Sequence, residues 1–239
     1  MTSATRVGRI IGMLLLAHLA TGLIVPYVLL QPLTKAPAGF LETAAGMSAQ
    51  VRFYVLLLFV GGAISVGISV AAWPIIRQRS YRLGLWLLVL AVVNFTLQII
   101  ENSHWLSMLS LSQAYAEAGA GDARLFLSLG MVIRAAWKWA HYSHILVVVG
   151  WLFTLFCLLF RCAMVPRALA GIGMVFCVSQ FVGITLPTFA GYRMPYPEFF
   201  GMPLGVLDIV LAVWLMANGF RGPDARTGAD VPRVDVPRP

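Results

Sequence analysis

Residues 53–100 read FYVLLLFVGGAISVGISVAAWPIIRQRSYRLGLWLLVLAVVNFTLQII. Two apolar runs, at about 53–76 and about 83–104, are separated here only by a short arginine-rich turn. Because about 20 apolar residues in a helix span a bilayer, this stretch predicts a helical hairpin that crosses a membrane twice.

The rest of the chain repeats this pattern. Four further apolar runs predict spans at about 9–30, 136–160, 168–187 and 203–220. Of the 239 residues, 60% are hydrophobic and 11% are charged, which excludes a soluble domain, where about 25% would be charged. We therefore expect an all-α polytopic transmembrane helix bundle with six spans. It forms one domain over residues 1–221, followed by a disordered cytoplasmic tail over residues 222–239.

The basic residues indicate the orientation of the bundle. A net charge of +8 can indicate a nucleic-acid partner, but here the basic residues flank the apolar runs, so we expect no nucleic acid. Of the 17 basic residues, 11 lie on the side of the two termini. The positive-inside rule then places both termini in the cytoplasm and the protein in the cell inner membrane. The expected partners are the lipid bilayer, a lipid or small apolar ligand, and a second copy of the chain.

Polar residues inside the predicted spans are the candidates for function. An ionisable side chain in a bilayer costs about 2.5 to 3.5 kcal/mol, so each one needs a partner or a use. These residues are Asn94, Gln98 and Glu101 in the third span, Arg134, Lys138, His141 and His144 around the fourth, and Asp208 in the sixth. At a rise of about 1.5 Å per residue, the acids and both histidines reach a similar depth in the outer leaflet. We predict a polar pocket there, with Glu101, His141 and Asp208 as candidate catalytic residues.

Three interpretations of this pocket need no metal. Pairing of Glu101 with Lys138 or Arg134, and of Asp208 with a histidine, would serve only to hold the helices together. A relay through Glu101, His141 and Asp208 would indicate a proton- or ion-coupled small transporter. A protonated Glu101 or Asp208 would instead suit an enzyme that modifies a lipid or isoprenoid by acid catalysis.

Two further interpretations involve a cofactor. Glu101 with His104, and His141 with His144, have the i, i+3 spacing that turns two ligands toward one metal in a bundle. His104, His141 and His144 are therefore candidate zinc ligands of a membrane-embedded metal-dependent hydrolase. Haem held by two of these histidines is another alternative.

Two other sets of residues have simpler explanations. His18, near the middle of the first span, is expected to bond a neighbouring backbone group instead of binding a ligand. Gly61, Gly62, Ser65 and Ser69 on the second span are typical of a small-residue packing surface.

Three short motifs support a family resemblance. RVGRIIG at residues 6–12, VPRALAG at 165–171 and DIVLAVWLMANG at 208–219 resemble the bacterial six-span membrane proteins grouped as domain of unknown function 4386. The resemblance covers about residues 5–221 and implies the same membrane topology. It also implies a histidine at the position of His141, a glutamate where this chain has Asp208, and a glutamine where it has Glu101. It brings no known activity.

Overall fold

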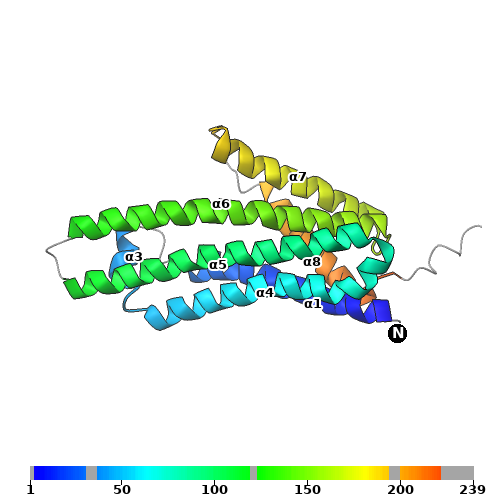
Figure 1. Ribbon diagram of the computed structural model, residues 1–239, viewed down its shortest axis with the longest axis horizontal. Helices are drawn as coiled ribbons and strands as arrows, with labels where there is room; N and C mark the ends of the chain where they lie inside the picture. The colour runs from blue at the N-terminus through cyan, green and yellow to red at the C-terminus, as the bar shows by residue number, and fades with distance from the viewer. Residues whose placement is uncertain (1–2, 31–36, 119–122, 194–199, 222–239) are drawn as a thin grey trace, which may run out of the picture.

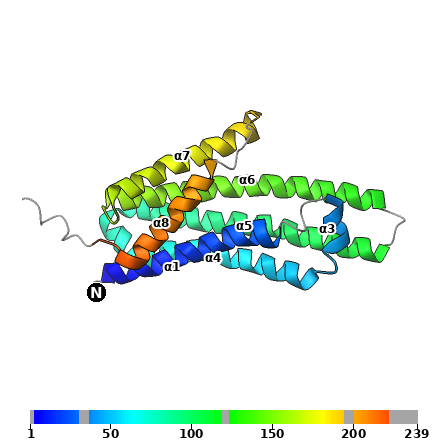
Figure 2. The ribbon, with the colours of Figure 1, turned by 180° about the vertical axis from the view of Figure 1, so that it is seen from behind.

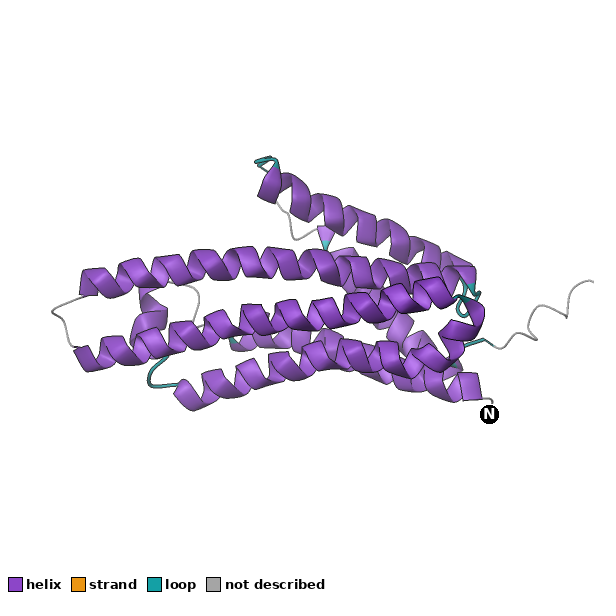
Figure 3. Cartoon of the chain, viewed as in Figure 1, coloured by secondary structure: helices purple, strands orange, loops and turns teal. Residues whose placement is uncertain are grey.

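The chain folds into an elongated bundle of helices (Figures 1 and 3). The computed structural model describes residues 3–30, 37–118, 123–193 and 200–221, and within these ranges it contains no strand. Its elements are α1 (Ser3–Ile24), the π-helical segment η1 (Val25–Leu29), α3 (Pro37–Thr43), α4 (Ser48–Arg79), α5 (Tyr81–Ala118), α6 (Ala123–Arg161), α7 (Arg167–Phe189) and α8 (Met202–Asn218). The all-α prediction is confirmed, while the predicted tail over residues 222–239 lies outside the described residues.

The helices have the lengths and surfaces of a membrane protein. Helices α1, α4, α5, α6 and α7 are long and apolar enough to cross a bilayer, and α8 is an apolar helix of 17 residues. Large apolar side chains cover their outward faces, with Trp86, Val175 and Val213 all more than half exposed. Such surfaces require lipid around them, which confirms the predicted bundle of about six spans in a bilayer.

Arginine side chains hold one end of the bundle together. Arg79, at the end of α4, donates to the carbonyl oxygens of Cys162 at 3.2 Å and Arg221 at 3.3 Å, which follow α6 and α8. Arg9 of α1 donates to the carbonyl oxygen of Ala217 near the end of α8 at 3.0 Å. These donors satisfy carbonyl groups that a helix leaves without partners at its C-terminus. The first residues of α1 and the last of α8 therefore lie at the same, arginine-rich end (Figure 2).

Helices α5 and α6 are longer than their predicted spans. Helix α5 continues from about residue 104 to Ala118, and α6 begins at Ala123 instead of near residue 136. With 38 and 39 residues they are about 57 and 58 Å long, whereas the hydrocarbon core of a bilayer is about 30 Å thick. A helix of this length that crosses the bilayer extends beyond its hydrocarbon core, and the predicted spans cover only part of each helix.

Two apolar cores fill the bundle, and the polar site lies between them. One core lies toward the arginine-rich end and includes Ile68, Leu87 and Trp151. The other lies toward the opposite end, where the short helix α3 packs on α5 and α6, and it includes Phe40 and Trp105 (Figure 1).

Candidate functional site

The polar stripe of α5 faces the inside of the bundle, as its spacing predicts. Asn94, Gln98, Glu101 and Trp105 are between 0% and 8% exposed. Side chains four, three and four residues apart lie on one face of a helix, and the apolar positions between them face outward. The stripe therefore brings a carboxyl group into the bundle, where only neighbouring helices can provide partners.

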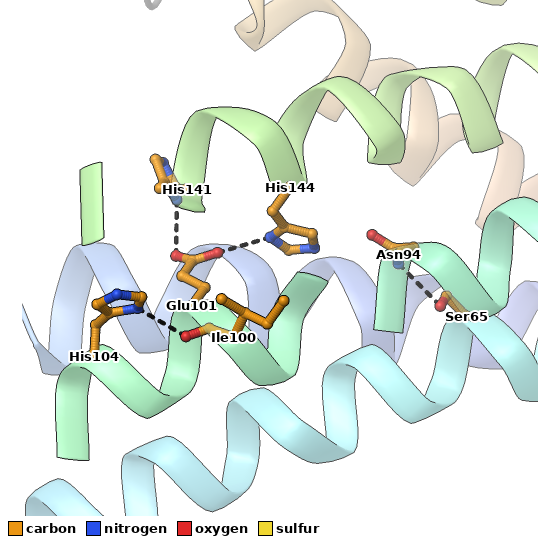
Figure 4. A network of polar contacts seen from close by, with 7 residues as sticks. All are labelled: Ser65, Asn94, Ile100, Glu101, His104, His141 and His144. Atoms are coloured by element: carbon orange, nitrogen blue, oxygen red, sulfur yellow. Dashed lines mark hydrogen bonds and ion pairs between the residues drawn. The ribbon is translucent and has the colours of Figure 1, made fainter. Parts of the chain in front are cut away.

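Helix α6 provides two histidines as those partners (Figure 4). Oε1 of Glu101 lies 2.8 Å from Nδ1 of His141, and Oε2 lies 2.8 Å from Nδ1 of His144. Because the histidines are three residues apart, both rings project from the same side of α6 toward α5. Carboxylate oxygens accept hydrogen bonds, so Nδ1 of each ring donates and Nε2 of each neutral ring keeps its lone pair.

The two histidines differ in their access to the outside. The side chain of His141 is 28% exposed, whereas that of His144 is 10% exposed. The ring of His141 stacks on Trp137, with 5.1 Å between ring centroids. Nε2 of His144 is buried and has no hydrogen-bond partner among the described residues. Glu101 thus connects a partly exposed histidine with a buried one, and we name these three residues the His–Glu–His cluster.

The cations considered as partners of Glu101 lie elsewhere. Arg134 and Lys138 are exposed, and the Lys138 ammonium lies 5.8 Å from the centre of the Tyr142 ring. The ion pairs of Glu101 in the described ranges are with His141 and His144, so the predicted pairing with either cation is wrong.

His104 does not join the cluster. Its Nδ1 lies 2.8 Å from the carbonyl oxygen of Ile100 on its own helix, and the ring is partly exposed (Figure 4). Among the described residues, no group of three or more His, Cys, Asp or Glu side chains has a geometry that could hold a metal ion. The structure therefore does not bring His104, His141 and His144 together as a set of zinc ligands.

Asp208 also lies apart from the cluster. Helix α8 packs against α1 and α7, and the Asp208 carboxyl group interacts electrostatically with Cys177 of α7. No hydrogen bond or ion pair in the described ranges joins Asp208 to Glu101 or to either histidine of the cluster. The residue is 9% exposed, and its Oδ1 is buried without a hydrogen-bond partner there. The similar depth of the two acids thus did not place them at one site.

A second group of polar contacts lies closer to the arginine-rich end than the cluster. Nδ2 of Asn94 donates to Oγ of Ser65 at 3.0 Å, and Nε1 of Trp151 donates to Oγ of Ser69 at 3.1 Å. Ser69 in turn donates to the backbone oxygen of Ser65 at 3.0 Å. The two serines were interpreted only as small packing residues. The two serines are four residues apart, so both lie on the face of α4 that is turned toward Asn94. This spacing is the signal that could have identified them.

His18 bonds a backbone group, which confirms the prediction for this residue. Its Nδ1 lies 2.9 Å from the carbonyl oxygen of Gly61 on α4. Its ring also meets Trp151 of α6 edge to face, with 5.6 Å between centroids. His18 also interacts electrostatically with His144, which residue spacing could not predict because the two residues lie on different helices.

A helical chain with apolar outward faces and buried polar residues is a polytopic integral membrane protein. The family model described as Domain of unknown function (DUF4386) matches residues 10–219, so the chain belongs to this family. The resemblance carried by the three sequence motifs is thereby confirmed. No curated protein and no solved structure matches the chain. Its function must therefore be inferred from the site.

Proposed function

We propose that this protein translocates protons across the membrane, with the His–Glu–His cluster as its proton-binding site. The observation that carries the proposal is the double hydrogen bond of Glu101. Its two oxygens lie 2.8 Å from Nδ1 of a partly exposed histidine and 2.8 Å from Nδ1 of a buried one. Acid and imidazole groups linked inside a membrane protein are typical of proton relays.

The chemistry of the three groups suits a relay. Imidazole can take up a proton at one ring nitrogen and release one from the other. A proton that binds Nε2 of His141 from outside releases the Nδ1 proton to Oε1 of Glu101. Neutral Glu101 then carries the proton inside the bundle, and the charge has moved from the surface to the α5–α6 interface.

The residues on the far side of the cluster support entry from one side only. Beyond Ser69, toward the arginine-rich end, the interior is closed by apolar side chains that are at most 1% exposed. These are Ile68, Ala72, Ile76 and Leu87. A relay that is open to one side and closed to the other requires a change of conformation to release its proton, as transport by alternating access does.

We further propose that the arginine-rich end faces the cytoplasm of a cell inner membrane. The proposal follows from the positive-inside rule, with Arg9, Arg79 and Arg221 all at this end. His141 then faces the outer side, and protons would enter from there.

Proton uptake by reconstituted protein tests the proposal. Purified protein is placed in liposomes that contain a pH-sensitive dye, and a potassium gradient with valinomycin sets the membrane potential. We expect wild-type protein to acidify the lumen faster than protein-free liposomes when the lumen is negative. Glu101→Gln should abolish the difference, because an amide cannot exchange a proton in this range of pH.

His104→Gln is the matched control. It changes a histidine one turn from Glu101 that bonds only the backbone oxygen of Ile100 among the described residues. This variant should acidify the lumen at the wild-type rate. Proton uptake by Glu101→Gln at the wild-type rate, or no uptake above protein-free liposomes by the wild type at either polarity, would contradict the proposal.

A further inference from the structure

We infer that His18 of α1 is the inner acceptor of this relay and receives protons that leave Nε2 of His144. The inference rests on the proposed function and adds to it a residue from a third helix. It assigns to His18 a role beyond the backbone hydrogen bond that the residue makes with Gly61.

The position of His18 supports this role. Trp151 lies seven residues after His144 on the same face of α6, which is about 10 Å closer to the arginine-rich end. The ring of His18 contacts that of Trp151 and also interacts electrostatically with His144. His18 is therefore the next titratable side chain inward from the His–Glu–His cluster among those that interact with it in the described ranges.

The hydrogen bonds of the two rings point to the same pair of nitrogens. The carbonyl oxygen of Gly61 can only accept, so Nδ1 of His18 donates and Nε2 keeps its lone pair. Nε2 of His144 is buried and has no hydrogen-bond partner in the described ranges, an arrangement that costs free energy and that a role in proton transfer would explain. Transfer starts from protonated Glu101 and the His144 tautomer that carries its proton on Nε2. Nδ1 of His144 then takes up the proton of Glu101 while Nε2 releases its own proton to Nε2 of His18, directly or through a water molecule. The step leaves Glu101 ionised, His144 neutral with Nδ1 as the donor to Glu101, and His18 protonated.

Close helix packing allows the third histidine to reach this level. Gly61 has no side chain, and a Cβ atom there would collide with Oγ1 of Thr21 on α1. Thr21 in turn donates to the backbone oxygen of His18 at 2.8 Å. Helix α1 can therefore approach α4 closely enough for the His18 side chain to reach the α6 face of His144 and Trp151.

Electrostatic repulsion between the rings favours transfer of a proton from His144 to His18 over protonation of both rings at once. The described groups that interact with His18 are the Gly61 carbonyl, the Trp151 ring and His144, and no acid is among them. If both imidazoles were protonated, their charges would repel each other, and the repulsion is strong in a medium of low dielectric constant. A proton gained by His18 is therefore one that His144 has lost, and the pair carries one charge at a time.

His18→Asn tests the inference with the hydrogen bond to Gly61 preserved. The Asn amide nitrogen replaces Nδ1 as the donor, but the side chain cannot take up a proton. In the liposome assay we expect His18→Asn to lose proton uptake down to the level of protein-free liposomes. Its melting temperature in detergent should stay at the wild-type value, which separates a role in proton transfer from a role in packing.

The outcomes distinguish the inference from the proposed function. Wild-type uptake that is lost in Glu101→Gln but kept in His18→Asn overturns the inference alone. Uptake that Glu101→Gln does not affect overturns the proposed function, and the inference with it.

A measurement on protein with His18 intact covers the case in which His18→Asn does not fold. In nanodiscs with ¹⁵N-labelled histidine, acidification should protonate both ring nitrogens of His18 in wild-type protein but not in Glu101→Gln. His18 signals that stay those of a neutral ring while His141 titrates would overturn the inference and leave the entry site in place.

Discussion

At the level of single residues, the two buried acids Glu101 and Asp208 differ in their hydrogen bonds. Both oxygens of Glu101 accept hydrogen bonds from imidazoles, whereas Oδ1 of Asp208 has no partner in the described ranges. Burial of a carboxylate without partners costs several times more than burial of a paired one. Asp208 is therefore held at a cost to stability, as residues kept for function often are.

This difference predicts opposite effects of two amide substitutions on stability. Asp208→Asn removes the charge from a buried, incompletely paired group, so its melting temperature in detergent should equal or exceed that of the wild type. Glu101→Gln replaces one acceptor oxygen by a donor that faces an imidazole N–H, and should destabilise the protein by about 1 to 3 kcal/mol. His104→Gln is the control, with little effect expected. A decrease for Asp208→Asn as large as for Glu101→Gln would mean that Asp208 is fully paired.

At the scale of helices, periodicity predicted which face of α5 is buried but not where α5 ends. Ser103, Ser107 and Ser110 are exposed on its far half, and such a polar stretch has no membrane signal. The start of α6 instead exposes Leu125 and Val132. Hydropathy identifies only the apolar runs, so the parts of α5 and α6 outside the predicted spans at about 83–104 and about 136–160 were not predicted as continuations of these helices. The turn between α5 and α6 at residues 119–122 lies outside the described residues.

Contact between α1 and α8 depends on glycine at one position. A Cβ atom on Gly8 would lie 2.7 Å from the carbonyl carbon of Gly219, and a backbone atom cannot move aside as a side chain can. Gly219 itself has a φ of 67°, which favours glycine.

Alanine at Gly8 should therefore separate the two helices and destabilise the protein by about 1 to 3 kcal/mol. Gly22→Ala on the same helix is the matched control, because no atom of the described residues lies within 4 Å of a Cβ atom there. That variant should equal or exceed the wild type in stability, because alanine favours a helix over glycine by about 0.5 to 1 kcal/mol. Thermal unfolding in detergent measures both variants, and equal effects of the two would contradict a close α1–α8 contact.

For the protein as a whole, the sequence predicted the class of protein and the three residues of the His–Glu–His cluster, but it wrongly added Asp208 to the site. The spacing of polar residues alone predicted that Glu101 lies inside the bundle and that His141 and His144 share one face of α6. Depth estimates could not show that α8 packs on α1 and α7, so Asp208 was assigned to a site that it does not reach. Spacing also could not show that the Arg134 and Lys138 side chains are exposed, which leaves the imidazoles as the partners of Glu101.

The orientation of the bundle in the membrane is the remaining prediction. Gln78 lies at the arginine-rich end and Ser128 in the part of α6 that precedes its predicted span at about 136–160, and both are exposed. With Cys157, Cys162 and Cys177 replaced by alanine, a single cysteine is introduced at either position. If the positive-inside rule holds, a membrane-impermeant maleimide should label Ser128→Cys in intact spheroplasts and Gln78→Cys only after permeabilisation. Ser65→Cys, at a position that is fully buried, should stay unlabelled in both conditions. Labelling of Gln78→Cys in intact spheroplasts would reverse the orientation and move the entry of protons to the cytoplasmic side.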